Sequence, residues 1–122
     1  MSLKFFFALL SAGAIAVSAC ASTSSSECTT GSACGACSTA GSCDRQCIGG
    51  GCSFQCTSAG SCNFACPDGK CTVTATGPGS VNLSCAGGGC TIDCRGTGSC
   101  NILDCAGGGC TCNRTGTGSC NP

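Results

Sequence analysis

Residues 60–97 read GSCNFACPDGKCTVTATGP (60–78) followed by GSVNLSCAGGGCTIDCRGT (79–97), two units of equal length that align position by position. The preceding unit, 41–59, also has 19 residues, and the following unit, 98–117, has 20 because one residue is added inside NILDC. A constant period near 20 residues is typical of solenoids, in which each repeat forms one coil. The period therefore indicates the fold class before any single segment is considered.

Each unit contains two segments in which cysteines flank an apolar residue, as in CSFQC (52–56) and CTIDC (90–94). Positions one, three and five of a strand share one face, so the cysteines and the apolar residue should point inward together. Gly-rich turns of four or five residues separate the segments, and glycine readily adopts the positive φ of tight reversals. The expected inner apolar residues are Phe54, Phe64, Val73, Leu83, Ile92 and Ile102.

The sequence thus predicts an all-β protein, a small disulfide-stapled β-solenoid of short strands and Gly-rich turns with about 19 residues per coil. The alternative is a disulfide-rich β-meander with little regular structure, which does not require loops of constant length. Arg45 falls at an inward position of the first full unit and is expected to cap an open end.

The polar residues between the inward positions should form rows on the outer faces, about 4.8 Å apart along each row. One expected row is Ser53, Thr72, Thr91 and Thr111, and the other is Asp44, Asn63, Asn82 and Asn101. The threonine row resembles the ice-binding face of disulfide-rich insect antifreeze solenoids, but only Thr72 and Thr74 provide the paired threonines of that family. The simpler interpretation is that small polar residues solvate the outer faces.

The composition argues against several functions. The 122 residues include 19 Cys and 21 Gly but no His, Trp or Tyr, and only five basic and five acidic residues. Without a basic patch, we expect no nucleic-acid partner. Without His, and with few and scattered Lys and carboxylates, we expect no catalytic residues, no cofactor and no enzymatic activity.

Metal binding is the main rival explanation for so many cysteines. Metallothionein-like chains use dense Cys-x-Cys and Cys-x-x-Cys spacing, whereas this chain has one of each, at Cys110–Cys112 and Cys34–Cys37. Most of the other gaps contain three to five residues with apolar centres, which suits structural cystines rather than zinc sites. We therefore expect no metal site and no redox motif.

The stretch 71–85 shows which cysteines should pair. Ala75 aligns with Cys56 of the preceding unit and Val81 with Cys62, so two cysteines are absent on either side of one turn. If these positions normally bond to each other, losing both leaves no orphan thiol. The missing cysteines would then be a missing pair.

Extending this turn rule uses all eighteen cysteines that follow Cys20. The predicted disulfides are Cys28–Cys34, Cys37–Cys43, Cys47–Cys52, Cys56–Cys62, Cys66–Cys71, Cys85–Cys90, Cys94–Cys100, Cys105–Cys110 and Cys112–Cys120. A rival scheme bonds equivalent cysteines of successive units, but it leaves an odd column of Cys37, Cys56 and Cys94 unless Cys112 joins. Connectivity cannot normally be fixed from sequence, so both schemes remain open.

The N-terminus predicts export. Residues 1–19 combine Lys4 with an apolar run that suits a signal peptide and is too short to span a bilayer. Val17-Ser18-Ala19-Cys20 resembles the bacterial lipobox, which implies a lipidated Cys20 as the mature N-terminus and a membrane partner through that lipid. The Ser-rich stretch 20–27 would be a tether, and 28–122 the cysteine-rich repeat domain.

Two modes of export are compatible with the sequence. Ala21 after the cysteine implies outer-membrane sorting in Gram-negative lipoproteins, so a lipid-anchored protein of the cell outer membrane is expected. The competing interpretation is ordinary cleavage at Ala19-Cys20-Ala21, an A-x-A match that would release an extracellular protein. Either route delivers the cysteines to an oxidising compartment.

The repeated GSCN, AGGGC and CTIDC-type units behind the lipobox resemble cysteine-rich repeat lipoproteins of Gram-negative, myxobacteria-like bacteria. The resemblance spans most of residues 28–121 and carries no activity with it. The first functional hypothesis is a non-enzymatic, lipid-anchored envelope or surface protein that acts as a structural or adhesive module. The alternatives are a soluble secreted disulfide-rich effector and a metal- or thiol-buffering protein.

Overall fold

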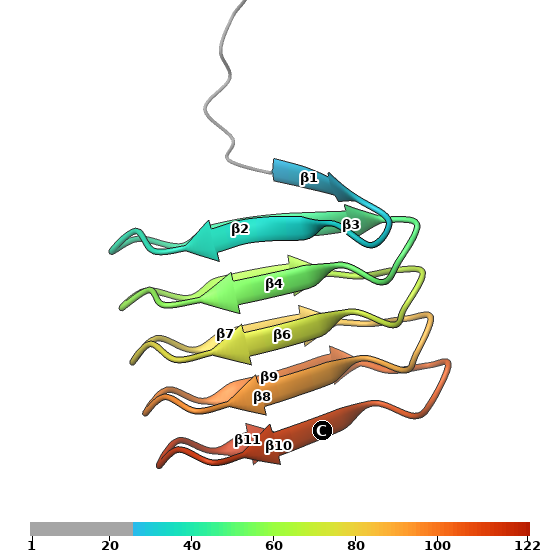
Figure 1. Cartoon of the computed structure of the whole chain (residues 1–122). Helices are drawn as coiled ribbons and strands as arrows, with labels where there is room; N and C mark the ends of the chain where they lie inside the picture. The colour runs from blue at the N-terminus through green and yellow to red at the C-terminus, as the bar shows by residue number, and fades with distance from the viewer. Residues whose placement is uncertain (1–25) are drawn as a thin grey trace, which may run out of the picture.

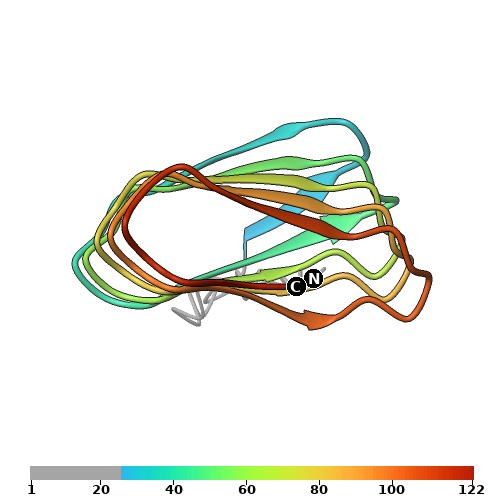
Figure 2. The ribbon, with the colours of Figure 1, turned by 90° about the horizontal axis from the view of Figure 1, so that it is seen from below.

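The structure is a computed structural model, and it describes residues 26–122. The chain winds into a stack of flattened coils, and successive strands alternate between two facing sheets (Figure 1). Seen along the stack, each coil is a narrow loop with two long sides and two turns (Figure 2). The first strand begins at Ser26, so two residues of the expected tether belong to the solenoid.

Odd-numbered strands form a six-stranded sheet and even-numbered strands a five-stranded sheet. The six-stranded sheet contains β1 (Ser26–Thr29), β3 (Cys43–Ile48), β5 (Cys62–Ala65), β7 (Val81–Ser84), β9 (Cys100–Asp104) and β11 (Cys120–Asn121). The five-stranded sheet contains β2 (Ala33–Cys37), β4 (Ser53–Cys56), β6 (Thr72–Ala75), β8 (Thr91–Cys94) and β10 (Thr111–Arg114).

Every strand pair in residues 26–122 is parallel and joins a strand to the one two places further along the chain. The register places Asn63 opposite Asn82 and Asn82 opposite Asn101, so one repeat of sequence equals one step between coils. Consecutive antiparallel hairpins would be needed for a meander. The predicted β-solenoid is therefore confirmed, and the meander alternative is wrong.

The interior is a thin layer of apolar side chains between columns of cystine. Five expected inner residues are buried, namely Phe54, Phe64, Val73, Leu83 and Ile92. The rings of Phe54 and Phe64 stack across the interior with centroids 4.5 Å apart and planes inclined by 16°. Short side chains and disulfides suffice here because the two sheets lie close together.

The last coil differs from the others in two ways. The register shifts between the pairs Leu83–Ile102 and Ser84–Asp104, so the extra residue of this coil is a bulge at Leu103, whose side chain is 68% exposed. Ile102, which we expected inside, is only partly buried because it lies in the last coil of the described chain.

The turns lie on two edges. The turns 48–51, 67–70, 86–89 and 106–109 form the triglycine edge, and the turns 38–42, 57–61, 76–80, 95–99 and 115–119 form the glycine–serine edge. On the triglycine edge, Gly51 has φ +70° and Lys70, one coil further, has φ +60°. On the glycine–serine edge, Gly79 does not have positive φ, but a Cβ there would overlap the Gly60 carbonyl of the neighbouring coil.

The expected role of glycine is thus correct for one edge and wrong for the other. On the triglycine edge, glycine supplies a backbone conformation, as predicted, and at Gly69 and Gly88 it also permits the close approach of the neighbouring coil. On the glycine–serine edge, glycine instead permits the close approach of stacked coils. The sequence pattern alone does not distinguish these two roles of glycine, because close approach depends on which backbone of the neighbouring coil lies against the turn.

Candidate functional site

Nine disulfides cross the turns at the two edges of the solenoid. The triglycine edge and the first turn carry Cys28–Cys34, Cys47–Cys52, Cys66–Cys71, Cys85–Cys90 and Cys105–Cys110. The other edge carries Cys37–Cys43, Cys56–Cys62, Cys94–Cys100 and Cys112–Cys120. These are the pairs that the turn rule predicts, and no bond of the rival scheme occurs in the described chain.

Ala75 and Val81 occupy the coil of the glycine–serine edge that has no disulfide. The register stacks them between Cys56–Cys62 and Cys94–Cys100 of the adjacent coils. Ala75 is 3% exposed and Val81 is fully buried. Two small apolar side chains therefore occupy the space of one cystine without exposing the interior.

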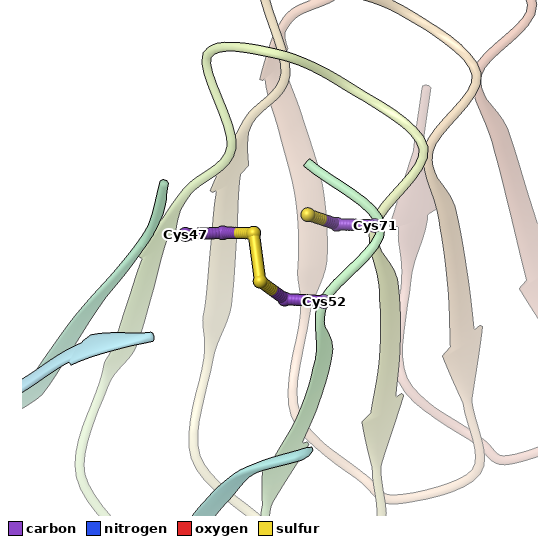
Figure 3. Close-up of side chains that lie close together, drawn as sticks. All are labelled: Cys47, Cys52 and Cys71. Atoms are coloured by element: carbon purple, nitrogen blue, oxygen red, sulfur yellow. A yellow bond between two sulfur atoms is a disulfide. The ribbon is translucent and has the colours of Figure 1, made fainter. Parts of the chain in front are cut away.

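Stacking also brings sulfurs of adjacent coils together. Figure 3 shows Cys71 beside the Cys47–Cys52 disulfide, and the three sulfurs lie within 4.8 Å of one another. Cys66, Cys71 and Cys90 form a similar group one coil further. Because a metal binds the thiolate and all of these sulfurs are in disulfides, the oxidised solenoid offers no thiolate ligand in either group. The groups are a consequence of coil stacking.

The asparagine row on the six-stranded sheet is a continuous hydrogen-bonded ladder. The amide of Asn63 donates to Asp44 Oδ1 (2.7 Å), that of Asn82 to Asn63 Oδ1 (3.0 Å), and that of Asn101 to Asn82 Oδ1 (3.1 Å). Asn121, which the sequence analysis had not included, extends the ladder by donating to Asn101 Oδ1 (2.8 Å). An ionised Asp44 accepts but cannot donate, so it suits the acceptor end of a ladder whose amides all donate in one direction.

The serine–threonine row on the five-stranded sheet has the predicted register, with Ser53, Thr72, Thr91 and Thr111 on neighbouring strands. The hydroxyls of Thr91 and Thr111 are 3.1 Å apart and hydrogen-bonded. Each outer face thus carries a regular row of small hydrogen-bonding groups, all neutral except Asp44.

A groove of about 270 Å³ lies across strands β3 to β9 of the six-stranded sheet, beside the ladder. The groove has a simple cause in the neighbouring outward row, where Gln46, Ala65 and Ser84 stand on consecutive strands. Ala65 and Ser84 are short and leave a depression, which Gln46 bounds toward one end and the bulged Leu103 toward the other. The sequence signal for the Leu103 end of this groove is the residue added inside NILDC in the unit 98–117.

Charged side chains are few and dispersed. The one ion pair within residues 26–122 joins Arg95 to Asp93, with Arg95 Nε donating to Asp93 Oδ2 at 2.7 Å. This hydrogen bond and the nearby negative charge raise the pKa of Arg95. Arg45 lies half-buried at its inward position, and its Nε is buried without a hydrogen-bond partner among the described residues.

Cys20, the predicted lipidation site, lies outside the described residues, as do the signal peptide and most of the tether. Residues 26–122 contain no helix that could cross a bilayer. No protein-family model, curated protein or solved structure matches the chain.

Proposed function

We propose that this protein is a non-enzymatic, lipid-anchored protein of the cell envelope or surface, and that its solenoid serves as a structural or adhesive interaction module. The assignment includes no cofactor, no nucleic-acid partner and a membrane partner only through lipid on Cys20. The supporting observation is a covalently stapled rod whose two outer faces carry regular rows of small polar groups, behind the sequence Val17-Ser18-Ala19-Cys20.

The disulfides support a role outside reducing compartments. Six to nine residues, half-cystines included, lie within each disulfide-closed ring, and each ring is worth roughly 2 kcal/mol in the loop-entropy model. Such a rod keeps its shape without a large apolar core. A rigid spacer or a fixed display surface is the use that this architecture favours.

Mass spectrometry of the protein purified from its native envelope without reductant tests the proposal. We expect a diacyl or triacyl mass on Cys20 and no free thiol. The matched control is Cys20→Ala, which should move the protein from the membrane fraction to the soluble fraction while leaving all nine disulfides intact.

The alternatives give different results in the same experiment. A lipid-free chain that begins after Ala21 would favour a soluble secreted effector, a reading supported by the match Ala19-Cys20-Ala21. Substantial free thiol together with bound metal would favour the metal- or thiol-buffering protein. Either result would overturn the anchored assignment.

A further inference from the structure

The groove on the six-stranded sheet has unused hydrogen-bonding capacity. A primary amide offers two N–H donors and two acceptor lone pairs. Asn63 and Asn82 each use one N–H donor and one acceptor lone pair within the ladder. Each therefore retains one free N–H and one free lone pair. Gln46 and the Ser84 hydroxyl also line the groove, and their side chains make no hydrogen bond to the rest of residues 26–122.

These groups are held in place before any ligand arrives. The ladder fixes the orientation of each amide between two neighbours, and Asn63 and Asn82 are half-buried on parallel strands. Little side-chain freedom would be lost on binding, which lowers the cost of association. A donor and an acceptor are therefore presented together at two consecutive coils along the groove, by Asn63 and Asn82.

The electrostatics favour a neutral ligand. Asp44 and Arg45, of opposite sign, both line the groove at β3, and no other charged residue does. Arg45 lies at an inward position of β3 with its Nε buried, and the Asp44 carboxylate already accepts a hydrogen bond from Asn63, so the remaining side chains that line the groove are neutral. The apolar residues that line the groove are Ala65, Leu103 and the buried Phe64, and a Leu that is 68% exposed offers a platform for C–H groups.

We propose that this groove binds a neutral oligosaccharide, and that it is the adhesive surface of the envelope module, a refinement that rests on the proposed function. A sugar hydroxyl both donates and accepts, so one hydroxyl can satisfy the free N–H and the free lone pair of a ladder amide. The C–H face of the ring packs against Leu103. The groove is slightly smaller than a typical small-molecule pocket, roughly 300–1,000 Å³, so it suits one or two sugar rings.

The affinity of one groove should be weak, because the groove is shallow and buries only part of a ligand. Many copies held on one membrane would compensate, since linked sites bind a repeating polymer with an avidity above that of each site. A repeating glycan is therefore a better partner for an anchored array than a free monosaccharide.

Saturation-transfer NMR on the oxidised full-length protein tests the proposal. The probes are neutral gluco-, manno- and N-acetylglucosamine oligosaccharides, with a polyuronate oligosaccharide and a neutral peptide as counter-probes. Ala65→Leu fills the floor of the groove from an outward position, and Thr74→Leu places the same side chain at an outward position on the opposite sheet. We expect at least one neutral oligosaccharide to bind, Ala65→Leu to lose at least tenfold in affinity, and Thr74→Leu to bind normally.

Three outcomes would overturn the inference. These are no binding of any neutral sugar, equal binding by wild type and Ala65→Leu, and preference for the polyuronate or the peptide. The lipid state of Cys20 is measured separately. A lipidated protein that binds no sugar would therefore exclude the glycan site while leaving the envelope assignment intact.

Discussion

The two edges of the solenoid both reverse the chain between the facing sheets, but their turns differ in length and backbone conformation. The triglycine edge reverses the chain in four residues and needs left-handed backbone, as at Gly51 with φ +70°. The glycine–serine edge uses five residues, and its Gly79 is required because the Gly60 carbonyl of the next coil lies where a Cβ would be. The triglycine edge keeps a cystine at every coil, whereas the glycine–serine edge replaces one with Ala75 and Val81.

Comparison of the two edges shows that a cystine and a glycine each have separable roles in this solenoid. A cystine both crosslinks a turn and fills the interior, and two small apolar residues can take over only the filling. A glycine provides positive φ, as at Gly89, a lack of bulk, as at Gly79, or both, as at Gly69. A residue such as Lys70 can replace it only where bulk is tolerated. Four experiments test these distinctions.

Complete reduction should have the largest effect, because it removes the crosslinks of both edges at once. We expect loss of the β-sheet circular dichroism signal in excess dithiothreitol. Under limiting reductant, Cys105–Cys110 and Cys112–Cys120 should open first, since their sulfurs lie in the partly buried last coil. Alkylation followed by peptide mapping gives the order. If all disulfides of one edge opened before any of the other, the expectation that the last coil is reduced first would be wrong.

Gly79→Ala should destabilise the protein by about 3 kcal/mol, because its Cβ forces two backbones apart. The matched control is Gly89→Ala on the triglycine edge. Gly89 has φ +68° and its Cβ would meet nothing closer than the Lys70 side chain at 3.6 Å, so backbone strain of about 1 kcal/mol is the expected cost. Guanidinium unfolding measures both. Equal losses would show that the two edges use glycine in the same way.

Ala75→Cys with Val81→Cys should restore the missing cystine and stabilise the protein by about 2 kcal/mol. The neighbouring cystines of this column have Cα–Cα distances of 6.2 and 6.3 Å, and the register places the new pair between them. Free-thiol counting and the unfolding midpoint are the measurements. Ala75→Cys alone is the control and should leave one free thiol without the gain. Two unpaired thiols in the double variant would refute the missing-pair interpretation.

Lys70→Gly should have the smallest effect, a stabilisation below about 1 kcal/mol. The substitution relieves the left-handed conformation at φ +60° but increases the freedom of the unfolded chain, and the two changes nearly cancel. Thermal unfolding of the oxidised protein measures the difference. A clear destabilisation would mean that the Lys70 side chain, not the backbone, matters at this position.

The features that repeat along the chain could be predicted from the amino-acid sequence alone. The 19-residue period predicted parallel coils, the alternation within CSFQC predicted which side chains are buried, and the absence of two cysteines around one turn predicted the turn-crossing pairs. These predictions succeeded because each depends on local spacing and on comparison of one unit with the next. The outward rows followed from the same alternation.

Features that depend on contacts between coils became visible only in the folded structure. It showed that the asparagines form a ladder that Asn121 extends, that Gly79 is required by the backbone of another coil, and that one extra residue places Leu103 at the end of a groove. None of these could be derived from a single unit, because hydrogen bonds, close backbone approach and surface shape arise only once coils are stacked. Periodicity therefore specifies the coil, whereas the packing of one coil on the next specifies the surface.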